Sequence, residues 1–207
     1  MLLDLHALAA KYAMRISGVL HVGAHEAEEA PLYRSVAPEA RVLWVEANPE
    51  IAARIQAIGV PDVHQALVSD TDGEQVDFII TNNGQSSSML ELAEHKWEHP
   101  DVVEVARIPL ATTTIHSLLN RVAPDFRFNF INLDIQGAEL KALRGMGDER
   151  MAAVDYVYTE VNERELYRGC ALIGEIDAFL LARGLRRVET SITGHGWGDA
   201  LYVRDAA

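Results

Sequence analysis

Short apolar runs alternate with helix-like segments along this chain. The runs at residues 18–22, 41–47 and 126–135 are each followed by a segment with helical patterning. Strands that alternate with helices in this way form parallel sheets, because each parallel connection crosses the sheet through a helix. The sequence contains no internal repeat and no linker. We therefore expect residues 1–207 to form one α/β domain with helices on both faces of the sheet.

The last part of the sequence narrows the choice of α/β fold. Strand-like segments at 185–193 and 199–204 are joined by a short glycine-rich loop. A connection this short forms an antiparallel hairpin, whereas dinucleotide-binding sheets usually close with parallel strands. A mostly parallel, seven-stranded sheet with a terminal antiparallel β-hairpin resembles the Rossmann-like fold of class I methyltransferases that depend on S-adenosylmethionine.

Charge and composition exclude several classes of partner. The chain has 18 Lys and Arg residues against 31 Asp and Glu residues, a formal net charge of −13, so we expect no nucleic-acid partner. A single cysteine, Cys170, excludes an intramolecular disulfide and a cysteine-built zinc site. Residues 1–16 read as an amphipathic N-terminal helix, and no apolar run approaches the roughly 20 residues of a membrane span. We expect a cytoplasmic protein with no membrane partner; its oligomeric state stays open.

Residues that close the first two predicted strands indicate a nucleoside site. Gly23, Ala24 and His25 follow the first strand, and a glycine there lets the backbone approach a ligand. Glu46 closes the second strand, where a carboxylate can accept both hydroxyls of an adenosine ribose. Ala47 and Asn48 come next, and Asn48 is also the expected N-cap of the following helix.

The residues of the same turn indicate which of two nucleoside ligands, a dinucleotide or S-adenosylmethionine, fits better. A pyrophosphate needs close backbone approach over several residues and an unobstructed helix N-terminus. This chain has Ala27, Glu28 and Glu29 at that end, where the acids would repel an anion. A sulfonium ligand has no phosphate and carries a positive charge, so the turn suits S-adenosylmethionine better. An NAD(P)-dependent oxidoreductase is the alternative among enzymes.

Several segments together resemble the FkbM family of methyltransferases. The strongest is FINLDIQGAELKALRGM at 130–146, and HVGAHEA at 21–27 and NNGQSSSML at 82–90 resemble two further family elements. His21, His25 and Ala27 depart from the residues that this family usually has there. These departures leave a non-catalytic cofactor-binding module with the same fold as a second alternative.

The resemblance implies a function and a set of cofactor contacts. FkbM-like enzymes methylate hydroxyl groups, so the chain is expected to be an O-methyltransferase that acts on a sugar, glycan or secondary-metabolite acceptor, a small molecule or glycan. The residues that would contact S-adenosylmethionine are His21, Gly23, Ala24, His25, Glu46, Ala47, Asn48, Ser69, Asp70, Ser87 and Asp134. Among them, Ser69 and Asp70 would lie near the adenine. The polar insertion at 82–100 is expected near the site.

Asp134 and Glu160 each end a very apolar strand at the edge of the sheet that should face the ligand. An acid in such a place needs a partner or a function. The pair could act as the general base for an acceptor hydroxyl, or could hold a divalent metal such as Mg²⁺ together with Asn162. The sequence leaves both roles open.

Histidines and aromatic residues complete the predicted site. His25 and His195 are the best placed proton acceptors at neutral pH, so the catalytic candidates are Asp134, Glu160, His25 and His195. The predicted acceptor contacts are Ser86, Ser88, Asn162, Tyr167, His195 and Trp197, of which Tyr167 and Trp197 offer flat faces for stacking. The remaining histidines of the middle region show no ligand spacing, and we expect them to be structural or exposed: His64, His95, His99 and His116.

Overall fold

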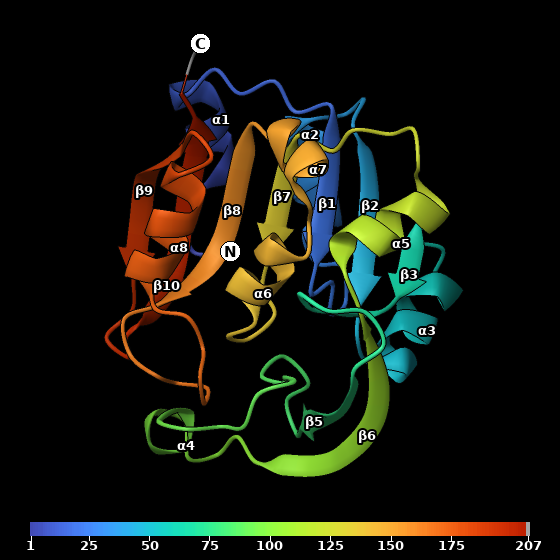
Figure 1. Cartoon of the computed structure of the whole chain (residues 1–207), viewed down its shortest axis with the longest axis vertical. Helices are drawn as coiled ribbons and strands as arrows, with labels where there is room; N and C mark the ends of the chain where they lie inside the picture. Colours follow the sequence, from blue (N-terminus) through green and yellow to red (C-terminus); the bar gives the residue numbers. More distant parts are fainter. Residues whose placement is uncertain (206–207) are drawn as a thin grey trace.

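The computed structural model describes residues 1–205 and confirms the predicted α/β architecture. Its main sheet has seven strands in the order β3-β2-β1-β7-β8-β10-β9 (Figure 1). The bounds of these strands are β1 Gly18–Val22, β2 Arg41–Glu46, β3 Val63–Gln65, β7 Phe130–Leu133, β8 Tyr156–Asn162, β9 Leu185–Ile192 and β10 Trp197–Arg204.

Strand directions confirm the predicted ending of the sheet. β3, β2, β1, β7 and β8 pair in parallel, whereas β10 is antiparallel to both β8 and β9. In the β10–β8 register, Trp197 lies opposite Asn162. The hairpin loop between β9 and β10 therefore lies at the same edge as the carboxyl ends of the parallel strands.

Helices cover both faces of this sheet (Figure 1). One apolar cluster contains residues of α5 to α8, including Leu119 and Leu180, and a second contains residues of α1 to α3, including Leu5 and Tyr33. No helix within residues 1–205 is both long and apolar enough to cross a membrane. The bounds are α1 Leu5–Lys11, α2 Ala30–Val36, α3 Pro49–Ala57, α5 Ile115–Val122, α6 Glu139–Arg144, α7 Asp148–Ala152 and α8 Ile173–Leu181.

Two predicted elements have different bounds in the structure. The N-terminal helix begins only after Asp4, whose side chain caps it by accepting from the N–H groups of His6 and Ala7. The apolar alternation at 62–68 predicts one strand, but the structure interrupts it at Ala66, whose N–H donates to the carbonyl of Glu46. The two residues after Ala66 then leave the main sheet.

A second, three-stranded sheet lies beyond the carboxyl ends of β1, β2 and β7 (Figure 1). It has the order β4-β6-β5, and its strands are β4 Leu67–Val68, β5 Gln75–Thr81 and β6 Glu104–Thr113. The insertion at 82–100 connects β5 to β6 and contains the short helix α4, His95–Glu98. This arrangement places the insertion across from the strand ends that carry the predicted site.

Candidate active site

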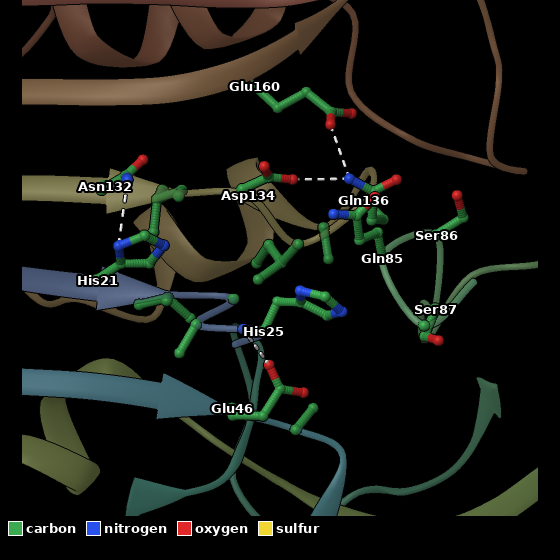
Figure 2. A pocket seen from close by; sticks show the side chains of 18 of the residues that line it. His21, His25, Glu46, Gln85, Ser86, Ser87, Asn132, Asp134, Gln136 and Glu160 are labelled. Atoms are coloured by element: carbon green, nitrogen blue, oxygen red, sulfur yellow. Dashed lines mark hydrogen bonds between the residues drawn. The ribbon is translucent and has the colours of Figure 1, made fainter. Parts of the chain in front are cut away.

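A cavity of about 600 Å³ lies at the carboxyl ends of the parallel strands. Its walls come from the ends of β1, β2, β7 and β8, from the insertion, and from Trp197 at the start of β10. Figure 2 shows strand-end side chains on one side and Gln85, Ser86 and Ser87 of the insertion on the other. Doubly wound sheets bind their ligands at this edge. The cavity is therefore the candidate active site.

The turn after β1 lines the cavity, and its glycine also makes a close backbone contact. Gly23 has a φ of 91°, and a Cβ there would lie 1.8 Å from the carbonyl oxygen of Asp134. The missing side chain admits the backbone that follows β7, and Gly23 itself lines the cavity. Ala24 and His25 line the cavity, and the Nδ1 atom of His25 lies 2.8 Å from a carboxylate oxygen of Glu28.

Glu46 is a buried carboxylate at the end of β2. One of its oxygens accepts from the N–H of His25 at 2.8 Å, and the other accepts from the N–H of Asn48 at 2.7 Å (Figure 2 shows the first). Burial raises the pKa of Glu46, while these two hydrogen bonds favour its ionised form. Both oxygens keep lone pairs for a ligand hydroxyl. Ala47 also lines the cavity, whereas Asn48 lies outside its wall and caps α3.

His21 stands at the cavity wall as a neutral imidazole. It is almost fully buried, packs against Trp44 with a ring-centroid distance of 4.8 Å, and its burial lowers its pKa to about 3. Asn132 donates to the hydroxyl oxygen of Tyr33 at 2.8 Å, and that hydroxyl lies 3.0 Å from Nδ1 of His21. The tyrosine proton is therefore directed to Nδ1, which assigns the other ring nitrogen of His21 as the N–H.

Asp134 and Glu160 lie close together and share a partner that the sequence reading did not single out. The side-chain amide of Gln136 donates to Asp134 at 2.7 Å and to Glu160 at 2.8 Å (Figure 2). Desolvation in the cavity wall raises the pKa of both carboxyls, although the side chain of Asp134 is exposed to the cavity and only Glu160 is buried, and the pKa of Glu160 is raised further by the charge of Asp134. Gln136 has a φ of 56°, in the left-handed region that non-glycine residues seldom adopt. The structure thus holds two carboxyls of raised pKa at the cavity wall.

This arrangement does not fit the predicted metal site. The amide of Gln136 fills the space between the two carboxylates with N–H donors, where a cation would need oxygen ligands. Asn162 lies outside the cavity wall, with its amide 3.4 Å from Glu160. Within residues 1–205, no group of three or more His, Cys, Asp or Glu side chains is arranged to hold a metal ion.

Only some of the serines predicted to contact a ligand line the cavity. Ser86 and Ser87 line the cavity, but Ser88 is buried behind it and donates to the carbonyl of Gln136 at 2.8 Å. Ser69 also lies outside the wall and donates to the carboxylate of Asp70, which faces Lys141. Neither of the two predicted adenine contacts, Ser69 and Asp70, lines the cavity. The wall at that end is apolar instead, and its residues are Ala66, Leu67, Val68 and Phe78.

Residues of β8, the following loop and the hairpin close the other end. Tyr167 and Trp197 line the cavity, and the hydroxyl of Tyr167 donates to Gln136 at 2.5 Å. His195 is exposed and lies outside the wall, because its Nδ1 contacts Glu98 of α4 at 2.8 Å. The structure thus does not place the predicted proton acceptor His195 at the cavity.

Several lining residues were missed by the sequence reading. His95 and His99 line the cavity, although we expected both to be structural or exposed. Gln136 and Asp199 line it as well. Asp199 could have been found from its place at the start of a strand that pairs with Glu160. No spacing or periodicity in the insertion indicates that its two histidines face the site.

Comparisons with known proteins agree with this geometry. Residues 21–187 match the methyltransferase FkbM domain. The 2-O-methyltransferase NoeI of Sinorhizobium fredii (strain NBRC 101917 / NGR234) is 25% identical over 162 residues, which cover 73% of this chain and 65% of that protein. The chain thus matches somewhat less than two thirds of this relative's length.

A solved methyltransferase structure shows the same fold, and others are similar. Precorrin-6y C5,15-methyltransferase from Geobacter metallireducens GS-15 is similar with a TM-score of 0.50 and 9% identity, over 97% of this chain and 87% of that one. A SAM dependent methyltransferase from Aquifex aeolicus has a TM-score of 0.48 and 12% identity, over 99% and 91% of the two chains. Because the family match covers most of the sequence, the chain belongs to the FkbM methyltransferase family.

Proposed function

We propose that the protein transfers a methyl group from S-adenosylmethionine to a hydroxyl of an acceptor held in the cavity. Family membership supports the transferase, and the fixed carboxylate of Glu46 at the end of β2 is the observation that supports the cofactor. The Glu28 and Glu29 carboxylates near the β1–α2 turn disfavour the pyrophosphate of NAD(P).

The cavity residues fit the parts of this cofactor. Glu46 would accept the ribose hydroxyls, and the apolar wall formed by Leu67, Val68 and Phe78 would contact the adenine. The turn at Ala24 and His25 would lie near the amino-acid end. When bound, the cofactor supplies a methyl group on a positively charged sulfur. Carboxylates in the wall favour that charge.

Residues near the reaction centre would orient the acceptor and manage its proton. Asp134 and Glu160 are held by Gln136, so their geometry is fixed before any ligand binds. Desolvation in the cavity wall raises the pKa of both carboxyls. Asp134 and Glu160 would bond an acceptor hydroxyl, and His25 is a further polar group of the same cavity wall.

A sugar or glycan hydroxyl is the favoured acceptor, with a secondary metabolite as the other class. The relative NoeI is a 2-O-methyltransferase, and this similarity supports transfer of the methyl group to oxygen. Tyr167 and Trp197 offer apolar faces of the kind on which sugar rings pack.

The test is methyl transfer from isotopically labelled S-adenosylmethionine to a panel of neutral methyl glycosides. We expect label in a methyl ether of at least one glycoside, identified by mass spectrometry. Binding of S-adenosylhomocysteine without transfer to any acceptor would favour the non-catalytic module. Hydride transfer to NAD or NADP would instead favour the alternative function, an NAD(P)-dependent oxidoreductase.

A further inference from the structure

The turn between β7 and α6 carries the side chain that joins the two carboxyls of the cavity wall. Gln136 lies in this turn with a φ of 56°, a left-handed conformation that non-glycine residues seldom adopt. Its side-chain amide donates to Asp134 and to Glu160. The positions of both carboxyls therefore depend on the contacts that hold Gln136 in this conformation.

Glu139, the first residue of α6, is a carboxyl that the proposed reaction does not use. Only 1% of this residue is exposed, and it does not line the cavity. Its Oε1 atom accepts from the N–H of Ile135 at 3.0 Å and from the N–H of Gly137 at 3.2 Å. These two residues flank Gln136 in the sequence. One carboxyl oxygen thus holds the backbone on both sides of Gln136.

Two further contacts fix the same turn. The hydroxyl of Ser88 in the insertion donates to the carbonyl of Gln136 at 2.8 Å. Gly137 has a φ of 98°, and a Cβ there would lie 2.8 Å from the Cβ of Cys170. The turn is therefore packed closely against the loop that follows β8, and it has no room for a side chain at that point.

The surroundings of Glu139 leave backbone N–H groups as the partners of its charge. Burial raises the pKa of Glu139 to about 7, whereas the N–H groups of Ile135 and Gly137 favour its ionised form. A hydrogen bond to a charged acceptor is stronger than one to a neutral acceptor. The carboxylate therefore holds the turn more firmly above about pH 7 than below it. Four titratable groups interact with this charge, and none of the four is a cation: Asp134, Glu160, Tyr167 and Cys170.

We propose that Glu139 is a positioning residue of the active site. Its carboxyl oxygen fixes the backbone around Gln136, and Gln136 in turn holds Asp134 and Glu160 where they meet the acceptor hydroxyl. This inference rests on the proposed methyl transfer, and it adds a residue that acts on the reaction without touching either ligand. A displacement of about 1 Å at a reacting group can lower a rate on the order of 100-fold.

The experiment compares two substitutions of Glu139. Glu139→Gln keeps a side-chain oxygen that can accept from both N–H groups, but this side chain does not titrate. Glu139→Ala removes the acceptor altogether. Glu149→Gln, an exposed change on α7, is the control. The probes are S-adenosylhomocysteine and a neutral methyl glycoside that the unaltered protein methylates.

We expect Glu139→Ala to lower kcat at least about 50-fold, because the carboxyl pair loses its fixed position. KM for the glycoside and Kd for S-adenosylhomocysteine should stay within about threefold, because Glu139 touches neither ligand. Glu139→Gln should keep kcat within about fivefold of the unaltered protein, since the acceptor oxygen remains. The control should keep normal values. A purely structural defect would instead lower Tm and weaken S-adenosylhomocysteine binding together with kcat.

A second readout does not depend on turnover. In the unliganded protein, the NMR signals of the Ile135 and Gly137 amide protons should titrate with a midpoint at about pH 7. This titration should be absent in Glu139→Gln. If Glu139→Ala does not fold, the amide signals decide.

Three results would each overturn the inference: normal kcat in Glu139→Ala, equal losses of kcat in the two Glu139 variants, or an unchanged amide titration in Glu139→Gln. If the unaltered protein transfers no methyl group while the two amides respond as expected, the proposed function fails and the contact of Glu139 with the turn is retained. The two failures are thereby distinguished.

Discussion

The carboxylate of Glu46 accepts a hydrogen bond from the backbone N–H of His25 at 2.8 Å, across a sequence separation of 21 residues. This bond joins the end of β2 to the turn after β1. His25 has a φ of 42°, so the turn holds a conformation that a non-glycine residue seldom adopts without support. Glu46 therefore fixes the turn, and in the proposed complex it would also accept the ribose hydroxyls.

The first prediction concerns Asp134. Replacing Asp134 by Asn keeps the hydrogen-bonding shape beside Gln136 but removes the charge from the reaction centre. We expect kcat to fall at least tenfold while Kd for S-adenosylhomocysteine changes less than threefold, because the carboxylate acts on the transition state rather than on ground-state binding. Steady-state kinetics with a reactive glycoside and calorimetry measure the two quantities. Unchanged turnover would remove Asp134 from the reaction centre.

The second prediction concerns metal removal. Gln136 donates to both Asp134 and Glu160, which leaves no place between them for a bound cation. We expect activity after dialysis against EDTA to stay within twofold of the untreated protein. Addition of Mg²⁺ or Mn²⁺ should cause no further increase. Loss of activity in chelator, with recovery on adding metal, would show that the amide of Gln136 moves aside for an ion.

Much of the fold could be predicted because it depends on local patterns. Apolar runs, the Asn48 cap and the short loop before β10 determine the strands, a helix and the terminal hairpin. The segment at 62–68 predicts one continuous strand, because its apolar and polar residues alternate. Its interruption at Ala66 depends on a hydrogen bond to Glu46 and on pairing of the next residues with β6, which are distant contacts.

The site was predictable only where topology alone places a residue. Glu46, Asp134 and Glu160 end parallel strands, and all three line the cavity. Ser69 follows a strand too, but that strand belongs to the second sheet, so the residue lies elsewhere. His95 faces the cavity because the whole insertion folds across the strand ends, and no local pattern in its sequence encodes that path.

The third prediction concerns stability against pH. Burial gives His21 a pKa of about 3 in the folded state, against 6.5 ordinarily. Between pH 6.5 and 3 the unfolded chain binds a proton that the folded chain does not, so this residue lowers the free energy of unfolding as the pH falls. The slope is at most about 1.4 kcal/mol per pH unit.

Substitution of His21 by Asn removes that contribution. The free energy of unfolding of the His21→Asn variant is measured by urea denaturation at several pH values. It should fall less steeply on acidification than the free energy of unfolding of the unaltered protein. His116→Asn serves as the exposed control, and it should keep the original slope. Equal slopes in all three proteins would mean that His21 is not held neutral by burial.

The fourth prediction concerns the hairpin. Trp197 lines the cavity, and His195 lies outside it, where Arg164 donates to the His195 carbonyl at 2.7 Å and to Glu98 at 2.8 Å. We expect Trp197→Ala to lower acceptor turnover at least tenfold through direct contact. His195→Ala should lower it too, by loosening the link between hairpin and α4.

Cofactor affinity should stay within about threefold in both variants, a change of less than 1 kcal/mol. Trp97→Ala is the matched control, since Trp97 lies on α4 but is 79% exposed. Calorimetry with S-adenosylhomocysteine and kinetics with a reactive glycoside measure the two effects. If both hairpin variants turn over the acceptor normally, the hairpin takes no part in acceptor binding.

The choice of S-adenosylmethionine as the cofactor is tested most directly by calorimetric titration of the protein with S-adenosylhomocysteine, NAD and NADP. We expect one-to-one binding of S-adenosylhomocysteine and no binding of either dinucleotide. Glu46→Ala should weaken the binding by on the order of 1–3 kcal/mol, whereas Glu50→Ala, an exposed change on the first turn of α3, should not. Tight binding of NAD would contradict the proposed cofactor, and full affinity of the Glu46→Ala variant for S-adenosylhomocysteine would contradict the proposed role of Glu46.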